Sequence, residues 1–331
     1  MRAFLCRVCD SPLVVEDVEC SVCWTATGYS RLEGDVVPVF NGTYLDSGGA
    51  RWFRCRNMEL SECNWLVPYE GEQCFSCGLT RTRPPDADLE GLALYPVAEG
   101  AKRHLVAELD RIGLPIVTRA EDPDKGLCFD MLSSVNEKII MGHNRGAVTI
   151  DLAEGDDVIR VKMQREFREP FRTMLGHFRH EIGHYYEMML VRGDERLEQT
   201  RELFGDETAP YHEAIDRHYQ KGPPRGWEAT YISSYATMHP FEDFAETFAH
   251  FLHIRDAVDT ANNFGLTNVD DDSERFGDLL RDTWIPLSVA LNQINRSMGR
   301  RPLYPFRLPD RVIEKLEFVA ELASNGRVHG H

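Results

Sequence analysis

Two histidines and a glutamate on one predicted helix are the strongest chemical signal in the sequence. The run from His180 to His184 reads His-Glu-Ile-Gly-His, which is the pattern H-E-x-x-H. Side chains four positions apart lie on one face of a helix, so both imidazoles can bind one zinc ion. Glu181 lies beside them, where it could take a proton from a water activated by that zinc. The pattern predicts a zinc-dependent hydrolytic site, and the alternative is two hydrogen-bonded histidines on a helix face.

A catalytic zinc needs a third protein ligand and one open coordination position. The extended metzincin pattern would require glycine and histidine where the sequence has Glu187 and Leu190, so that arrangement is excluded. We predict Glu242 as the third ligand. Glu246 follows one helical turn later and is predicted to accept a hydrogen bond from a ligating imidazole. The alternatives are a solvated acidic face for the two glutamates and, as rival ligands, His239, His250 and His253.

The two helices that must position these ligands are both predicted to begin at a proline. Proline is favoured in the first helical turn because its missing N–H costs nothing there. Pro170 precedes a helical pattern that continues to about residue 191, and Pro240 precedes a second pattern rich in phenylalanine, which indicates a buried helix. Tyr235 comes seven residues before Glu242. Spacing alone leaves open whether its phenol donates to an oxyanion or is an ordinary buried tyrosine.

Cysteine is concentrated in the N-terminal quarter, where eight of the nine cysteines precede residue 80. Cys6, Cys9, Cys20 and Cys23 form two CxxC pairs, and each pair can aim two sulfurs at one point. Two such pairs supply the four tetrahedral ligands of a closed structural zinc site. The alternative for a single CxxC is redox chemistry, but two adjacent pairs favour metal.

A second quartet is less regular but has the same ligand type. Cys74 and Cys77 form another CxxC, and Cys55 and Cys63 complete a predicted second structural zinc site. Iron is an alternative metal at either quartet because sulfur ligands alone do not exclude it. Cys128 is predicted to be a buried small hydrophobe. The N-terminus has no apolar run typical of a signal peptide, so we expect a cytoplasmic protein with reduced thiols.

The pattern along the chain predicts an α+β protein. Residues 1–80 are expected to form a small β-rich zinc-ribbon head, residues 81–95 a proline-containing linker, and residues 96–331 a mainly helical zincin-like metallopeptidase domain with a small sheet. An acidic connection is expected at 256–283, around Asp270 to Asp272. The predicted strands are 35–40, 51–54, 127–131, 138–141 and 147–152, with a hairpin loop at 142–146, and further helices are predicted at 97–112, 285–298 and 310–323.

The charge balance restricts the classes of partner. Lys and Arg total 37 against 54 Asp and Glu, which gives a net charge of −17. A field of this sign repels phosphate backbones and anionic membranes, so neither nucleic acid nor a membrane is expected as a partner. No stretch approaches the length of an apolar membrane span.

The H-E-x-x-H motif, the segment around Glu242 and the cysteine pairs resemble those of a family of bacterial zinc-binding metallopeptidases. The resemblance is carried by HEIGHYY, by SYATMHPFEDFAETFAHFLHI, and by the first cysteine quartet with the stretch Cys63 to Cys77. That family pairs an N-terminal zinc-ribbon region with a gluzincin-type body. The second motif is also similar to that of lethal-factor-type gluzincins. This similarity implies that Tyr235 donates a hydrogen bond to the oxyanion, that Glu242 is a zinc ligand, and that Glu246 hydrogen-bonds a ligating histidine from outside the ligand shell. The older thermolysin-like pattern has Asp where this chain has Glu246.

Together these features predict a gluzincin-type zinc metallopeptidase with one catalytic and two structural zinc ions. A water activated by Glu181 on zinc held by His180, His184 and Glu242 would hydrolyse a peptide or protein substrate. The head would have a structural role or recruit a protein, because a four-thiolate site has no open position for substrate. The alternative is a protein-binding module on an inactive peptidase fold.

Overall fold

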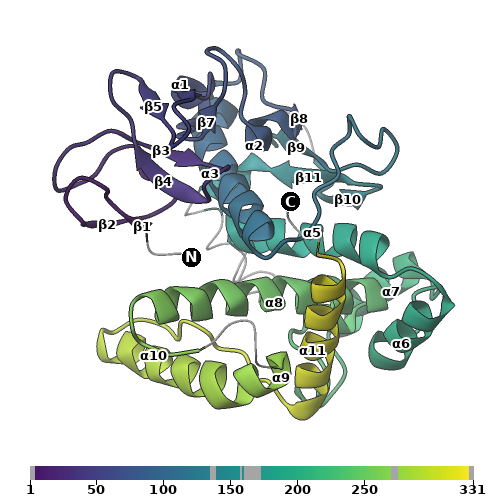
Figure 1. The fold of residues 1–331 in the computed structure, drawn as a ribbon. Coiled ribbons are helices and arrows are strands. Elements are labelled where there is room, and N and C mark those ends of the chain that lie inside the picture. Colours follow the sequence, from purple (N-terminus) through teal and green to yellow (C-terminus); the bar gives the residue numbers. More distant parts are fainter. Residues whose placement is uncertain (1–3, 135–138, 157–158, 160–172, 270–274, 328–331) are drawn as a thin grey trace. The chain divides into compact units, whose positions relative to one another are not determined.

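The computed structural model describes residues 4–134, 139–156, 159, 173–269 and 275–327 (Figure 1). These residues divide into two compact units, of which the first contains 4–159 with 173–178 and the second 179–327. Among the described residues, no helix has both the length and the apolar character needed to cross a membrane.

The cysteine-rich head is built from short antiparallel strands and two single-turn helices. Gly28 shows how closely they pack, because a Cβ there would lie 2.7 Å from Leu66 Cδ2 and 2.9 Å from the Asn64 carbonyl. Any larger residue would push the strands apart. The elements are β1 (Phe4–Leu5), β2 (Pro12–Leu13), β3 (Thr27–Ser30), β4 (Asp35–Pro38), β5 (Thr43–Leu45), β6 (Arg51–Arg54), α1 (Met58–Ser61), β7 (Leu66–Val67) and α2 (Phe75–Gly78), and the strands pair as β1–β2, β3–β4 and β5–β6–β7.

A four-stranded sheet in the order β10-β11-β9-β8 completes the first unit with helix α3 (Leu89–Arg111) and the turn η1 (Leu152–Gly155). Its strands are β8 (Thr80–Thr82), β9 (Cys128–Leu132), β10 (Gly142–Asn144) and β11 (Ala147–Asp151). Strand β9 is parallel to both β8 and β11, whereas β10 and β11 are antiparallel. Since β8 follows the last head cysteine directly and pairs with β9, the head and the sheet form one compact unit.

This arrangement differs from the predicted linker at 81–95. The end of β8 and the first turns of α3 occupy that segment, and α3 packs against α1 and α2 of the head. The division between the compact units lies instead near the start of helix α5 (Met174–Leu190), which begins in the first unit and continues in the second. Local proline signals cannot reveal a parallel pairing between distant strands, so they indicate a linker even where the chain continues into a paired strand and a helix.

The second unit is helical, with α8 (Pro240–Asn263) as its most buried long helix. Helices α6 and α11 pack against α8, as does the short turn η3 (Tyr235–Thr237). In Figure 1, α11 is the yellow helix that lies against the green α8. The remaining elements are α6 (Asp194–Phe204), α7 (Tyr211–Lys221), η2 (Trp227–Ala229), α9 (Phe276–Leu279), the π-helical turn η4 (Leu280–Trp284), α10 (Ile285–Ser297) and α11 (Asp310–Asn325).

The α+β class is confirmed, with a β-rich head followed by a mainly helical part. The helices predicted at 285–298 and 310–323 and the strands predicted at 51–54 and 147–152 agree with the structure to within two residues. The strand predicted at 138–141 is wrong for residues 139–141, because β10 begins only at Gly142. The hairpin loop predicted at 142–146 is shorter in the structure, where the turn consists of Arg145 and Gly146. Both have positive φ, 47° and 82°, as a tight type I′ turn requires.

The acidic connection predicted at 256–283 is wrong in its first part. Helix α8 continues to Asn263 and buries Val258 and Ala261. Asp270 to Asp272 lie outside the described residues, as does Pro170.

Candidate metal centre

The close approach of α5 and α8 creates the setting for the H-E-x-x-H motif. Gly183, the fourth residue of the motif, faces Ala245 on α8, and a Cβ at Gly183 would lie 2.8 Å from Ala245 Cα. Glycine and alanine therefore allow two helix backbones to approach closely within the second unit. The histidines on either side of Gly183 are thereby brought within reach of carboxylates on α8.

We expect Gly183→Ala to lower the free energy of unfolding of the second unit by about 1–3 kcal/mol, the usual cost of overpacking a tight contact. Thermal or urea unfolding would measure this loss. The matched control is Gly100→Ala on α3, where the nearest atom to an added Cβ is 3.8 Å away and the helix should gain stability. Equal tolerance of both substitutions would contradict the packing argument.

His180, His184 and Glu242 converge on one point. Glu242 Oε2 lies 3.0 Å from His180 Nε2 and 3.6 Å from His184 Nε2. The two imidazole rings are nearly perpendicular, with centroids 5.0 Å apart. One ligand atom from each residue lies within 4.8 Å of the others, which is the size of a shell around a single ion.

The environment of Glu242 fits a bound cation. Its side chain is buried, and Oε2 makes no hydrogen bond of acceptable geometry. Burial opposes ionisation, yet the neighbouring imidazoles of His184 and His180 outweigh it and hold the pKa of the carboxyl well below its usual value. A buried carboxylate oxygen left without a donor is costly unless a cation binds it. Two imidazole nitrogens and one carboxylate oxygen are a ligand set typical of a catalytic zinc.

Glu246 lies on the other side of His180. Its Oε1 is 2.8 Å from His180 Nδ1, one helical turn along α8 from Glu242. When His180 carries its proton on Nδ1 and donates it to Glu246, the other ring nitrogen, Nε2, has a free lone pair. This lone pair is directed toward Glu242 and the proposed metal position. The structure thus brings together His180, His184, Glu242 and Glu246.

The three rival ligands have other contacts, and none belongs to this group. His239 is the N-cap of α8, where its Nδ1 accepts from the Phe241 amide and its Nε2 lies 3.0 Å from the Ala209 carbonyl. His250 Nδ1 lies 2.8 Å from the Tyr304 hydroxyl. His253 Nδ1 lies 2.6 Å from Arg179 Nη1.

Two tyrosines approach the site from different elements. The Tyr235 ring, on η3, lies 5.8 Å from the His180 ring and 6.0 Å from the His218 ring of α7. The hydroxyl of Tyr211, at the start of α7, donates to Glu242 Oε1 at 2.8 Å. Tyr211 was missed from the sequence. Its signal was the amphipathic spacing of Tyr211, Ala214 and His218, which places three side chains on one face of a helix that we did not predict.

The first cysteine cluster lies near the molecular surface of the head. The sulfurs of Cys6, Cys9, Cys20 and Cys23 lie within 4.8 Å of one another. The separations of Cys6 from Cys23 and of Cys9 from Cys20 are both 3.6 Å. Cys6 and Cys20 are buried, whereas Cys9 and Cys23 are partly exposed. A closed tetrahedral metal site fits this arrangement.

The second cysteine cluster is buried on all sides. The sulfurs of Cys55, Cys63, Cys74 and Cys77 also lie within 4.8 Å of one another, and each residue is at most 3% exposed. Two backbone amides, those of Asn57 and Cys74, point at the Cys55 sulfur at 3.5 and 3.3 Å. Such amides stabilise thiolates, so the arrangement of this quartet fits a closed metal site despite its less regular spacing.

A buried ion pair borders the second cluster. Lys102 Nζ lies 2.7 Å from Glu99 Oε1, and both side chains are fully buried within α3 and its neighbours. Glu99 Oε1 also accepts from the Thr80 hydroxyl at 2.6 Å, and Glu99 Oε2 lies 3.9 Å from the Cys77 sulfur. The cluster is therefore linked by polar contacts to both α3 and strand β8.

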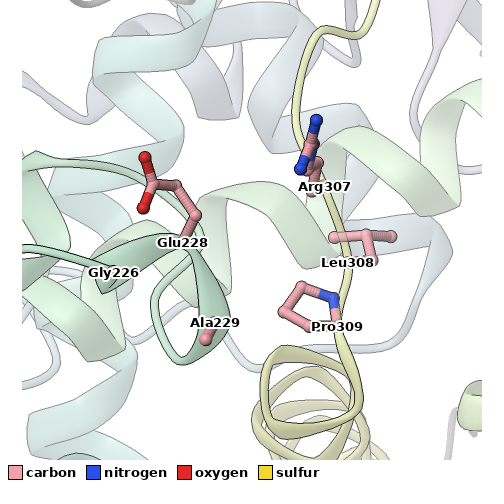
Figure 2. Close-up of a pocket in the computed structure, with 6 residues that line it drawn as sticks. All are labelled: Gly226, Glu228, Ala229, Arg307, Leu308 and Pro309. Carbon is pink, nitrogen blue, oxygen red and sulfur yellow. The ribbon is translucent and has the colours of Figure 1, made fainter.

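A separate open hollow of about 450 Å³ lies beside η2 in the second unit. Figure 2 shows Glu228 on one side of it and Arg307, Leu308 and Pro309 on the other. None of the predicted ligands or catalytic residues lines this hollow. It therefore does not belong to the metal centre.

Comparison with known proteins agrees with this division of sites. A family model described as "Putative zinc-binding metallo-peptidase" matches residues 92–322, and a zinc-ribbon model matches residues 3–88. Uncharacterized proteins of Mycobacterium bovis and Mycobacterium tuberculosis are each 48% identical over 329 residues, covering 96% of this chain and 94% of the relative. No solved structure matches the chain. With the family model spanning most of the chain and both cysteine clusters inside the zinc-ribbon match, the chain belongs to the zinc-binding metallopeptidase family and carries an N-terminal zinc-ribbon domain.

Proposed function

We propose that the protein is a zinc-dependent peptidase that hydrolyses peptide bonds by the gluzincin route. The observation that carries this proposal is the convergence of His180 Nε2, His184 Nε2 and Glu242 Oε2, with Glu181 between the two histidines on α5. Three protein ligands leave one position open, as a catalytic site requires.

The chain supplies the remaining groups for hydrolysis. Zinc, when bound, would polarise the scissile carbonyl and lower the pKa of a water molecule. Glu181 would take the proton of the attacking water and pass it to the leaving amine. Tyr235 would donate a hydrogen bond to the oxygen of the scissile carbonyl as negative charge develops on it. Glu246 would hold the His180 ring through Nδ1.

The zinc-ribbon head would hold two structural metal ions. Its clusters offer four sulfurs each and leave no position for substrate, so the head would either stabilise the first unit or recruit a protein substrate. Three metal sites of two kinds follow from this assignment, one labile and two closed.

Metal analysis tests the assignment directly. We expect about three metal ions per chain, with one removed readily by chelator, from the ligand rules for open and closed sites. His180→Ala should remove only the labile ion, measured by elemental analysis after gel filtration. The analysis also distinguishes zinc from iron in the head. A His180→Ala protein that retains every ion of the wild type would refute the catalytic-site assignment.

A second candidate is a protein-binding module on an inactive peptidase fold. It is favoured by the apolar side chains exposed around the first cluster, where Val8, Val22 and Trp24 are 52%, 63% and 72% exposed. Apolar groups displayed in this way are typical of interaction surfaces. Activity measurements on Glu181→Gln and the wild-type protein separate this candidate from the peptidase, because a binding module requires no general base.

A further inference from the structure

The two oxygens of the Glu242 carboxylate have different surroundings. Oε2 faces the imidazole nitrogens of His180 and His184, whereas Oε1 accepts the Tyr211 hydroxyl at 2.8 Å. One oxygen is therefore directed to the proposed metal position, and the other is held by a hydrogen bond from a different helix. This contact restricts rotation of the carboxylate, because turning it would break the bond to Tyr211.

The direction of this hydrogen bond follows from the chemistry of its two partners. An ionised carboxylate oxygen can only accept, so the Tyr211 hydroxyl donates its proton to Glu242 Oε1. Hydrogen bonds to an ionised group are stronger than those between neutral groups, so this contact can hold the carboxylate in one orientation.

The position of Tyr211 is fixed by His239. The His239 ring packs edge-on against the Tyr211 ring with centroids 5.1 Å apart. His239 Nε2 bonds the Ala209 carbonyl two residues before Tyr211, while its Nδ1 accepts from the Phe241 amide next to Glu242. One side chain thus joins the start of α7 to the start of α8. Tyr211 and Glu242 are held at a defined separation as a result.

We propose that Tyr211 is a positioning residue that holds the zinc-ligand carboxylate of Glu242 by one oxygen. The inference rests on the proposed function only in taking Glu242 as a zinc ligand. Hydrogen-bond partners of metal ligands orient them, and their loss typically costs about 10- to 100-fold in metal affinity. Tyr211 would therefore influence metal binding without touching the metal.

Zinc affinity measured by competition with a chromophoric chelator tests the proposal without any substrate. In the full chain, Tyr211→Phe should raise the zinc dissociation constant of the labile site about 10- to 100-fold. Tyr219→Phe removes a hydroxyl from an exposed tyrosine of the same helix and should leave the constant unchanged. An unchanged constant in Tyr211→Phe, or equal losses in both variants, would overturn the proposal.

Tyr235→Phe distinguishes positioning of the ligand from a general disturbance of the site. Tyr235→Phe removes a hydroxyl from a ring that lies beside His180, but it keeps the Tyr211 hydroxyl that donates to Glu242. Zinc affinity should therefore change little in Tyr235→Phe, and the double variant should match Tyr211→Phe. With cobalt in the labile site, the visible spectrum should change in Tyr211→Phe, because the carboxylate is free to turn. A greater loss of affinity in Tyr235→Phe than in Tyr211→Phe would overturn the proposal.

Folding is checked in the same samples. The zinc-induced rise in melting temperature reports affinity even in a destabilised variant, since a ligand stabilises the form that binds it. Tyr211→Met, which also lacks the hydroxyl, replaces the phenylalanine variant if the latter does not fold. If either variant shows the full zinc-induced rise, the positioning role of Tyr211 is wrong but the proposed function stands. If the wild-type protein has no labile zinc site, both the positioning role and the proposed function are wrong.

Discussion

Glu181→Gln should leave the labile zinc bound and reduce peptide hydrolysis about 100- to 10,000-fold, the range that general acid–base catalysis contributes. Glutamine has nearly the shape of glutamate but cannot accept a proton at neutral pH. Because Glu181 is not one of the three converging ligands, metal content should not change. The measurement is the rate of cleavage of a proteome-derived peptide library, followed by mass spectrometry, for proteins of verified zinc content.

The matched control is Glu195→Gln, which removes the same charge from an exposed position in the first turn of α6. It should cleave the library at the wild-type rate. If wild type and Glu181→Gln are equally active with zinc bound, hydrolysis by this route is wrong. If both are equally inert, the peptidase proposal fails, and the protein-binding candidate gains support.

The second large effect is expected in the head. Cys63→Ser should abolish metal binding at the buried second cluster and unfold the first unit, because structural zinc sites contribute about 10–16 kcal/mol of folding free energy. Cys63 is fully buried and its sulfur lies 3.6 Å from that of Cys74. The measurement combines elemental analysis with calorimetry, in which the transition of the first unit should disappear.

Cys128→Ser is the control for this experiment. Cys128 is buried in strand β9 of the same unit but belongs to neither cysteine cluster, so its variant should keep the full metal content. The two clusters should also differ in how fast they lose metal. Chelator should extract metal first from the cluster with the partly exposed Cys9 and Cys23, and metal loss from the buried cluster first would contradict this order.

The ligands on α5 and α8 could be predicted because their geometry is local. The i, i+4 spacing of His180 and His184 is a property of a single helix. Pro240 marks the first turn of α8, so the sequence also indicates that Glu242 and Glu246 lie on the same helix, one turn apart. The cysteine quartets could be predicted for the same reason, since CxxC pairs are short turns. These patterns require no knowledge of which elements meet in the fold.

The contacts that were missed depend on tertiary structure. Tyr211 reaches Glu242 across 31 positions of the sequence, and no local spacing reveals that contact. The parallel pairing of β8 with β9 joins residues 80 and 129 in the same way. The sequence showed the chemistry of each segment, but the pairing of distant segments follows from packing that periodicity does not encode.

The pairing of β8 with β9 determines where the protein can be divided. A cut after residue 80 would separate Thr80 from Phe129 and break the bond from the Phe129 amide to the Leu79 carbonyl. It would also separate α3, with its Lys102 side chain, from the residues around the second cysteine cluster. In the C-terminal fragment, β9 would keep its pairing with Thr82 but lose its pairing with Thr80, so part of its edge would be exposed to association with other chains. Fragments that end there, and chimeras that exchange heads between relatives at that point, would sever one folding unit. A ribbon fragment suitable for partner searches must extend through β11.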